Sequence, residues 1–454
     1  MDLLNLTLSE FRVLIETKRV KELRIVFEEW HPADIADMLT YLSLEEILFL
    51  FKTINKEQTS QVFSYCTIET QERLIEAFSG PQIKSILEHV EFDDVVDFLE
   101  ELPDNLVRKV LQNASDSQRQ EINILLSYHP NSAGALITTK YVEINEEDTL
   151  KEAINKVRSQ GKSAASIQTC FVVNQNDRLI GTARLKDMMT NPEDERVSEI
   201  METDVISVNT KDDREEVVKV FSKYDLSVVP VVNDQFCLVG IITVDDVIDV
   251  IEEEATEDIQ KMAAINPLEG SYLQTSVMDM FKSRIPWLLV LMVSATLTGL
   301  VMEAYAHITV ALTSLVMFIP MLMDTAGNAG SQASAMVIRG IAIDHLDIKD
   351  FFVVLWKEMK ASVITGIILF VVNVLRIVIF SPSLGWGIAV LVSIAIFFTI
   401  MLANLIGGSL PLVALLIKVD PAAMAGPVIT TLVDVVALII YFNMAAFYLG
   451  RVLA

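Results

Sequence analysis

The stretch at residues 426–449, GPVITTLVDVVALIIYFNMAAFYL, is apolar and long enough to cross a bilayer, which takes roughly 20 residues. It holds a single ionisable side chain, Asp434, near its middle. A carboxylate at that depth is costly unless it faces the protein interior, water or a cation, so intramembrane acids mark ion pathways and proton relays. The alternative is an Asp that only hydrogen-bonds a neighbouring helix in packing.

Charge divides the chain into two parts. From residue 284 onward there are 8 basic and 8 acidic side chains, so the whole net charge of −26 lies in residues 1–283, which contain no apolar run of membrane length. The sequence therefore predicts an acidic soluble region followed by a membrane domain at 284–454 with five spans. Besides 426–449, the expected spans are residues 285–304, 308–338 (long and interrupted), 361–380 and 384–417.

The basic residues of the membrane part predict its orientation. The second and fourth connections carry Arg339, Lys349, Lys357, Lys360 and Lys418, whereas the first and third contain no Lys or Arg. By the positive-inside rule the soluble region lies in the cytosol and the C-terminus outside. The start, MDLLNLTLSEF, lacks the basic flank and cleavage site of a signal peptide.

The composition of the soluble region predicts that it lies in a reducing compartment and that it binds cations. Its three cysteines, Cys66, Cys170 and Cys237, form no CxxC pair, so neither a disulfide framework nor a zinc site is indicated. The acidity argues against nucleic acid and anionic lipid surfaces and in favour of cations.

Residues 1–130 are expected to form short amphipathic helices, because apolar residues recur at three- and four-residue spacing. The segments 33–39 (ADIADML) and 93–99 (DDVVDFL) are similar at an offset of 60 residues. Such self-similarity predicts stacked helical hairpins in a small superhelix.

A second repeat follows. Residues 171–187 (FVVNQNDRLIGTARLKD) and 230–246 (PVVNDQFCLVGIITVDD) align at an offset of 59 residues. Each unit predicts a strand, a polar turn, a strand with Gly181 or Gly240, and then an Asp (187 or 246) as the N-cap of a helix. These units resemble tandem CBS domains, at 131–197 and 198–252. The resemblance implies one α/β pair that binds nucleotides or senses ions, with ATP as a candidate ligand.

A connecting segment at 253–283 continues the helix that the second repeat begins. In 244–258, VDDVIDVIEEEATED, the acids Asp246, Asp249, Glu253 and Glu257 lie on one helical face. Like charges at this spacing repel one another, so we expect something positive to balance them. Asn266-Pro267 should break the helix. The alternative is a plain solvated connecting helix.

The second span contains PMLMDTAGNAGSQ at 320–332, rich in glycine and polar side chains. With Pro320 this predicts a helix opened locally at membrane depth, the alternative being a mild kink at a helix contact. Carboxylate, amide and backbone oxygens are natural ligands of a divalent cation. One Asp per chain provides few ligands for a cation, but a two-fold dimer would bring two copies of Asp434 to one axis.

The complete order of parts resembles the MgtE family of bacterial magnesium channels or transporters. The most specific pieces are residues 320–332, DPAAMAGP at 420–427, Asp434 in TTLVD, and residues 244–258. The resemblance implies a mainly α fold, a homodimer in the bacterial cytoplasmic membrane, and a pore along the dimer axis for Mg²⁺ uptake. Asp434 would hold hydrated Mg²⁺ there, assisted by Asn328 and Thr430. Gly426 departs from the family, in which Asn precedes the proline.

The same resemblance gives the acids a regulatory role. Cytosolic Mg²⁺ would bridge carboxylates between the soluble domains and the connecting (plug) helix and shut the pore, which is negative feedback by differential binding to two states. The expected sensor residues are Asp93, Asp97, Asp213, Glu215, Asp225, Asp246, Asp249, Glu254, Glu257, Asp258 and Asp420.

Other function classes compete with this interpretation. An intramembrane aspartyl protease would use two membrane acids such as Asp324 and Asp434, but these enzymes share a GxGD motif, and TLVD at 431–434 lacks both glycines. We therefore expect no enzyme. A membrane-anchored ion or nucleotide sensor without transport would need no broken, polar span, and a broader Co²⁺ or Mn²⁺ transporter would share every feature named. A flux assay separates these classes.

Overall fold

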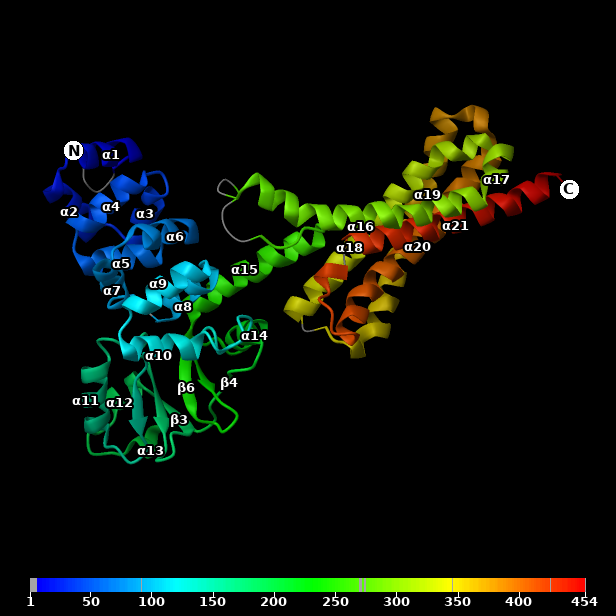
Figure 1. The fold of residues 1–454 in the computed structure, drawn as a ribbon. Coiled ribbons are helices and arrows are strands. Elements are labelled where there is room, and N and C mark those ends of the chain that lie inside the picture. The colour runs from blue at the N-terminus through cyan, green and yellow to red at the C-terminus, as the bar shows by residue number, and fades with distance from the viewer. Residues whose placement is uncertain are drawn as a thin grey trace. The chain divides into compact units, whose positions relative to one another are not determined.

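The computed structural model describes residues 6–90, 92–268, 272, 275–344, 346–424 and 426–453, without the side chains of 92, 93, 97, 100, 101, 104 and 451–453. Two compact units make up the chain, Met1–Glu253 and Glu254–Ala454. The first contains the helical and α/β parts and the second the long apolar helices, and both can be followed by colour in Figure 1.

The N-terminal part of the first unit is a stack of ten short helices. Serine and threonine N-caps begin several of them, and Thr7, Ser43 and Ser115 each form a capping box with the residue three positions later. Helix α3 packs on α5, α5 on α7 and α7 on α9, so the helices stack as the repeat predicts. The helices are α1 Leu8–Glu16, α2 Val20–Glu29, α3 Pro32–Leu39, α4 Leu44–Thr53, α5 Lys56–Ser64, α6 Ile68–Ala77, α7 Gly80–Leu87, α8 Phe92–Glu101, α9 Asp104–Asn113 and α10 Asp116–Leu125.

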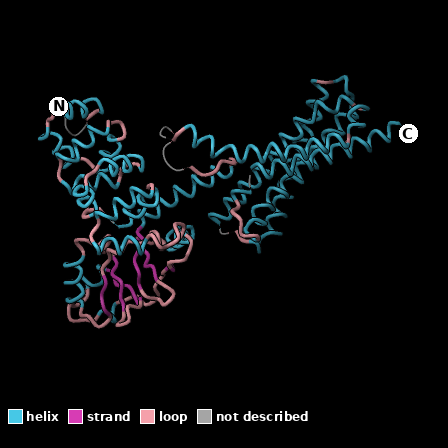
Figure 2. Tube along the Cα trace, in the orientation of Figure 1, coloured by secondary structure: helices cyan, strands magenta, loops and turns pink. Residues whose placement is uncertain are grey.

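The α/β part contains two three-stranded sheets with one topology, drawn in magenta in Figure 2. In each, the first strand runs parallel to the second, which pairs antiparallel with the third. The pairing shifts at equivalent places, Val172/Val173 and Val231/Val232, 59 residues apart. The repeat read in the sequence is therefore confirmed down to its irregularity. The strands are β1 Glu143–Asn145, β2 Thr169–Val173, β3 Leu179–Arg184, β4 Val208–Asn209, β5 Val228–Val232 and β6 Leu238–Thr243.

The helices of this part correct one prediction. Asp187 and Asp246 are not N-caps but the third residues of α12 and α15. Asp246 accepts hydrogen bonds from the Thr243 hydroxyl (2.6 Å) and the Thr243 backbone N–H (3.3 Å), so the acid stabilises the helix start from the first turn. The helices are α11 Leu150–Gln160, α12 Leu185–Thr190, α13 Val197–Ile200, α14 Arg214–Tyr224 and α15 Val244–Met262.

Helix α15 ends before the expected breaker at residues 266–267. Ala264 adopts a left-handed backbone conformation with φ of 56°, which stops the helix. The Gln260 side chain then binds the backbone of Leu268 in both directions, accepting from its N–H at 2.7 Å and donating to its carbonyl at 3.2 Å.

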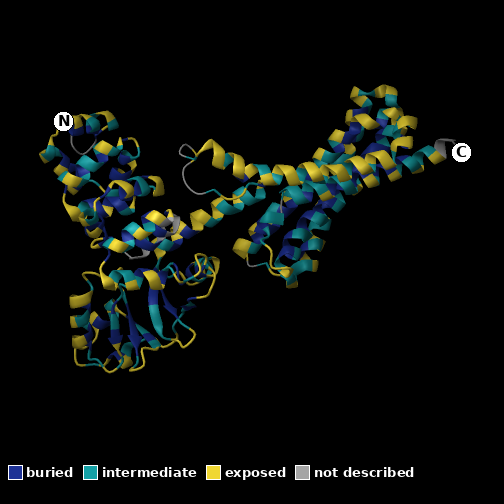
Figure 3. Ribbon diagram, in the orientation of Figure 1, coloured by how far each residue is buried: buried dark blue, intermediate teal, exposed yellow. Residues whose placement is uncertain are grey.

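In the second unit, four described helical segments are long and apolar enough to cross a membrane: Val277–Ala304, Ile348–Phe380, Pro382–Leu416 and Ala422–Gly450. Helix α18, with 26 residues, is slightly shorter and more polar. Large apolar side chains on α16 and α19 remain exposed (Figure 3), as lipid-facing helices require. The elements are α16 Val277–Ala304, α17 Ala306–Ala311, η1 Thr313–Phe318, α18 Ile319–Asp344, η2 Ile348–Asp350, α19 Phe351–Phe380, η3 Pro382–Leu384, α20 Gly385–Leu416, η4 Ala422–Met424 and α21 Gly426–Leu453.

The second span is interrupted, but not where the sequence predicted. Residues 320–332 belong to the unbroken helix α18, so the local opening expected there is wrong. Pro320 is its second residue, where the missing N–H costs no helical hydrogen bond. The irregular segment is instead η1, and the buried Tyr441 hydroxyl donates to the Leu315 carbonyl at 2.8 Å, which satisfies a backbone group that the break exposes.

Candidate functional site

Glycines bring three membrane helices into close contact. A Cβ on Gly407 of α20 would overlap the carbonyl oxygen of Gly330 of α18, and a Cβ on Gly330 would lie 2.9 Å from the Ile429 side chain of α21. A Cβ on Gly327 would lie 3.2 Å from the Thr430 methyl group. The glycines of 320–332 therefore serve helix packing, and they place this stretch beside the first turns of α21.

Asp434 lies one turn beyond Thr430 on α21. Its side chain is half-buried, and the buried oxygen Oδ1 accepts no hydrogen bond from any described residue. Buried polar atoms without a partner are rare and call for an explanation such as an ion or water. The packing alternative, in which Asp434 bonds a neighbouring helix, has no hydrogen bond to support it within the described part of the chain.

The other two predicted pore residues are engaged locally. The Thr430 hydroxyl donates to the Gly426 carbonyl at 2.8 Å, and Asn328 donates through Nδ2 to Asp324 at 3.2 Å. Packing brings Thr430 against the helix that carries Asn328, but among described groups no hydrogen bond joins either residue to Asp434. Asn328 still presents its amide oxygen, the atom suited to a cation or to its water shell.

The described residues of one chain do not form a complete metal site. Among the described residues, no group of three or more His, Cys, Asp or Glu side chains could hold a metal ion. Helices α18 and α21 thus offer only two carboxylates in this stretch of the described chain, the exposed Asp324 beside Asn328 and the half-buried Asp434, and so few direct ligands suit a cation that keeps most of its water shell.

The first unit gathers acids at the start of α15. Burial raises the pKa of the Asp246 carboxyl to about 6. The hydrogen bonds from Thr243 oppose this rise, and the charge of Asp245 adds to it. The charge of Asp94, on α8, adds to that rise. Burial likewise raises the pKa of Asp249, assisted by Glu252 and Asp245. One acid of the helical part therefore lies close enough to α15 for its charge to act on Asp246.

The remaining predicted sensors of this unit are spread out. Asp213 caps α14 by accepting from the Glu215 N–H at 2.9 Å, and both side chains are exposed. Between them Arg214 forms an ion pair with Glu253 at 3.0 Å, which is one of the positive charges expected to balance α15. Asp225 is the C-cap of α14, and it lines a cavity between the two repeats rather than lying with the other acids. The side chains of Asp93 and Asp97 lie outside the described residues.

The second unit brings four predicted sensors to one place. The Lys261 ammonium lies 2.5 Å from Asp420 and also forms an ion pair with Glu257. Burial raises the pKa of the neighbouring Asp258 to about 6, with further contributions from the charges of Asp420 and Glu254. After Arg214, Lys261 is therefore the second positive charge that balances the acids of α15.

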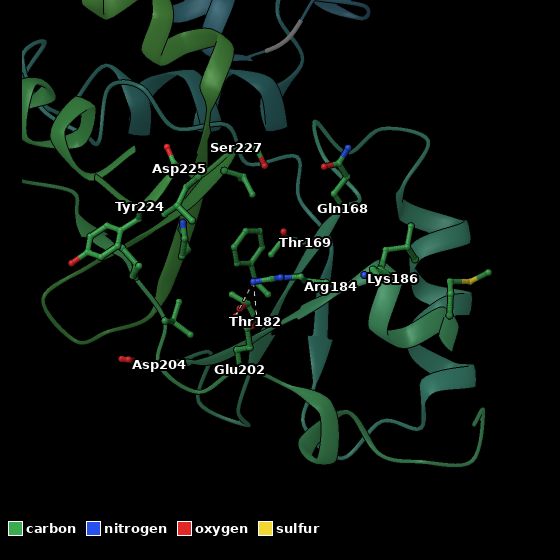
Figure 4. A pocket seen from close by; sticks show the side chains of 18 residues that line it. Gln168, Thr169, Thr182, Arg184, Lys186, Glu202, Asp204, Tyr224, Asp225 and Ser227 are labelled. Atoms are coloured by element: carbon green, nitrogen blue, oxygen red, sulfur yellow. Dashed lines mark hydrogen bonds and ion pairs between the residues drawn. The ribbon is translucent and has the colours of Figure 1, made fainter. Parts of the chain in front are cut away.

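A cavity of about 740 Å³ lies between the two CBS-like repeats. Figure 4 shows Thr182, Arg184 and Lys186 of the first repeat on one side and Tyr224 and Asp225 of the second on the other. Arg184 forms an ion pair with Glu202 at 3.1 Å. Basic side chains beside an aromatic ring and apolar strand residues could take phosphates and a base.

Comparisons with known proteins agree with this division. Three family models match: the MgtE intracellular N domain at residues 30–131, the CBS domain at 133–193 and 197–253, and the MgtE divalent cation transporter domain at 319–444. A magnesium transporter MgtE of Thermus thermophilus is 32% identical over 435 residues, covering 95% of this chain and 96% of that protein. The chain belongs to the MgtE family.

Other MgtE proteins are similarly related. A magnesium transporter MgtE of Bacillus subtilis is 29% identical over 449 residues, covering 96% of each chain. The solved cytosolic domain of the Mg²⁺ channel MgtE in complex with ATP matches with a TM-score of 0.51 at 31% identity, covering 54% of this chain and all of that one. These relatives are transporters, which points away from an enzyme.

Sequence reasoning missed two charged partners of the predicted sensors. The charge of Asp94 contributes to the raised pKa of Asp246, and its signal was the run DDVVD. Lys261 follows Glu257 by four residues, a spacing that favours an ion pair. Its contact with Asp420, 159 residues away, has no signal in the sequence.

Proposed function

We propose that this chain transports Mg²⁺ across the bacterial cytoplasmic membrane, into the cell, with Asp434 as the carboxylate that the ion meets inside the bilayer. The observation that carries the proposal is the buried Asp434 oxygen, which has no hydrogen-bond donor among the described residues, in a chain whose relatives in Thermus thermophilus and Bacillus subtilis are magnesium transporters. Mg²⁺ sheds its waters reluctantly, so one carboxylate with the Asn328 and Thr430 oxygens nearby can hold it through water.

The pore belongs to a homodimer in this proposal. Asp434 alone gives a single charge for a divalent ion, and a two-fold axis near it would supply the second. Among the described residues no group of three or more His, Cys, Asp or Glu side chains forms a complete site within one chain, which supports a site shared by two subunits.

Cytosolic Mg²⁺ regulates the transporter in this proposal. The acids Asp246 and Asp249 are held near other carboxylates, and so is Asp258. Two unit charges 4 Å apart interact by about 4 kcal/mol at an effective dielectric near 20. Removing Mg²⁺ would leave this repulsion unrelieved, and binding it would draw the acids together and favour the closed state.

Adenine nucleotide is the proposed ligand of the cavity between the repeats. Arg184 and Lys186 would receive the phosphates, and the apolar wall near Tyr224 would receive the base. A solved relative of the soluble region was crystallised with ATP, which supports the assignment.

The testing experiment is Mg²⁺ flux into proteoliposomes that contain the full chain. We expect uptake when the face that carries residues 1–283 is free of Mg²⁺ and loss of uptake when that face holds millimolar Mg²⁺. Vesicles without uptake in either condition would contradict transport and favour a sensor that moves nothing. Uptake that does not change with Mg²⁺ on that face would contradict the proposed regulation but not the proposed transport. Parallel measurements with Co²⁺ and Mn²⁺ decide between a Mg²⁺ transporter and a broader divalent transporter.

A further inference from the structure

The C-terminal end of α15 is attached to the connection between α20 and α21 by one lysine. Lys261 Nζ lies 2.5 Å from Asp420 Oδ2 and also pairs with Glu257, one helical turn earlier. The Lys261 side chain is only 25% exposed and that of Asp420 34%. Burial alone would disfavour the ammonium, but these two hydrogen bonds outweigh it and raise the pKa of Lys261. The Lys261 ammonium group is therefore fixed in place by the Glu257 and Asp420 carboxylates.

The Asp420 carboxylate is oriented for this contact. Its other oxygen, Oδ1, accepts a hydrogen bond from the Ala422 N–H at 2.7 Å. One oxygen thus fixes the turn before α21 while the second faces Lys261. Charge-assisted bonds of this kind are stronger than neutral ones, and the partly buried setting limits screening by salt.

Gly426 allows the end of α15 to approach α21. A Cβ at this position would overlap the Met262 carbonyl oxygen, the last carbonyl of α15. The negative end of α15 therefore meets the positive N-terminal end of α21, an arrangement that the helix dipoles favour. This gives a structural reason for glycine at position 426.

We propose that Lys261 is a built-in cation that keeps the end of α15 on the α20–α21 connection when no divalent cation is bound. The proposal rests on the proposed function, in which Mg²⁺ joins Glu257, Asp258 and Asp420 in the closed state. Without Mg²⁺, Lys261 pairs with two of these three acids and cancels one of their negative charges. The closed state is then partly populated at zero Mg²⁺, and Mg²⁺ completes a closure that the lysine has begun.

The first test is Mg²⁺ flux with three full-length variants. Lys261→Gln removes the charge and retains a polar side chain, and Lys261→Arg keeps the charge. Lys282→Gln is the matched control, because the Lys282 side chain is 68% exposed and forms a local ion pair with Asp279 three residues away. We expect Lys261→Gln to raise flux several-fold when the regulatory face holds no Mg²⁺ and to move the closing midpoint to higher Mg²⁺. The other two variants should match the wild type.

Two results would overturn the proposal. If Lys261→Gln matches Lys282→Gln in both flux and midpoint, the ion pair has no part in closure. If Lys261→Gln closes at lower Mg²⁺ than the wild type, the lysine competes with Mg²⁺ instead of substituting for it. A wild type without flux would contradict the proposed function, and the second test then decides the inference by itself.

The second test measures the reactivity of the amine and needs no transport. The full chain in detergent and EDTA is treated with an amine-reactive reagent near pH 8.5, and labelling of each lysine is followed by mass spectrometry. Lys261 should react several-fold more slowly than Lys282, and Asp420→Asn should bring its rate close to that of Lys282. Equal rates for the two lysines in the wild type would show that Lys261 is not held and would overturn the proposal.

Discussion

Gly407 of α20 packs directly on the carbonyl oxygen of Gly330 of α18, leaving no room for a side chain. Interfaces of small residues are how membrane helices approach closely, since no hydrophobic effect drives helices together inside lipid. This contact sets the spacing of the helices around the first turns of α21, where Thr430 and Asp434 lie.

Gly407→Ala should therefore destabilise the membrane unit. The added methyl group meets backbone, which cannot rotate away, and overpacking of this kind costs about 1–3 kcal/mol. We expect a lower thermal unfolding midpoint in detergent. Gly299→Ala is the control, because a Cβ there meets nothing within 4 Å. Equal midpoints for the two variants would show that α18 and α20 can separate without cost.

The stability of the soluble region should depend on pH through Asp246. Its pKa in the folded state is about 6 against an ordinary value of 3.8, so between these two values the folded protein binds more protons than the unfolded one. The associated stability is therefore present below about pH 4 and is lost as pH rises to about 6. Asp246→Asn should raise the unfolding temperature in EDTA at pH 8, and this gain should shrink below pH 5.

Calorimetry of the wild type and the variant across this pH range checks the prediction. Asp194→Asn, at an exposed acid, serves as control and should change little at any pH. A gain for Asp246→Asn that is the same at pH 4 and pH 8 would mean that its cause is not the buried charge.

Neutralising the acids of α15 should weaken closure by Mg²⁺. Asp246→Asn, Asp249→Asn and Glu257→Gln together remove the repulsion of the open state, but they also remove the ligands through which Mg²⁺ would lock the closed state. Mg²⁺ flux through the triple variant should then persist at Mg²⁺ concentrations that abolish flux through the wild type. An unchanged closing midpoint would make these acids a solvated surface and place the sensor elsewhere.

The two ends of the chain should lie on opposite sides of the membrane. A cysteine placed after Arg451 should react with an impermeant reagent in intact cells, whereas one placed before Asp2 should react only after lysis. Reaction of both cysteines in intact cells, or of neither, would require an even number of spans. The division of residues 284–454 would then be wrong.

Local patterns predicted much of the fold. The offset of 59 residues gave matched strands and even a matched irregularity at Val172 and Val231, because strand periodicity and turn chemistry are local properties. The opening expected at 320–332 failed because Pro320 falls in the first turn of α18, and glycine has the same sequence signal whether it frees the backbone or admits a neighbouring helix.

The candidate site was less predictable than the fold. Asp434 could be recognised because a charge in an apolar run is a local anomaly. The contact of Lys261 with Asp420 could not, because it depends on how the end of α15 meets a turn far along the chain. The sequence therefore allowed the charged residues to be singled out as candidates, while their partners required the structure.

The most direct measurement of the central claim compares Mg²⁺ uptake by the wild type and Asp434→Asn in proteoliposomes. The amide keeps the size of the side chain and removes the charge that the ion would meet inside the bilayer. Glu303→Gln, at an exposed acid near the end of α16, is the matched control and should retain uptake. We predict that Asp434→Asn folds with an unchanged size-exclusion profile and loses most or all uptake. Uptake at the wild-type rate in Asp434→Asn would contradict the account and leave Asp434 with a packing role.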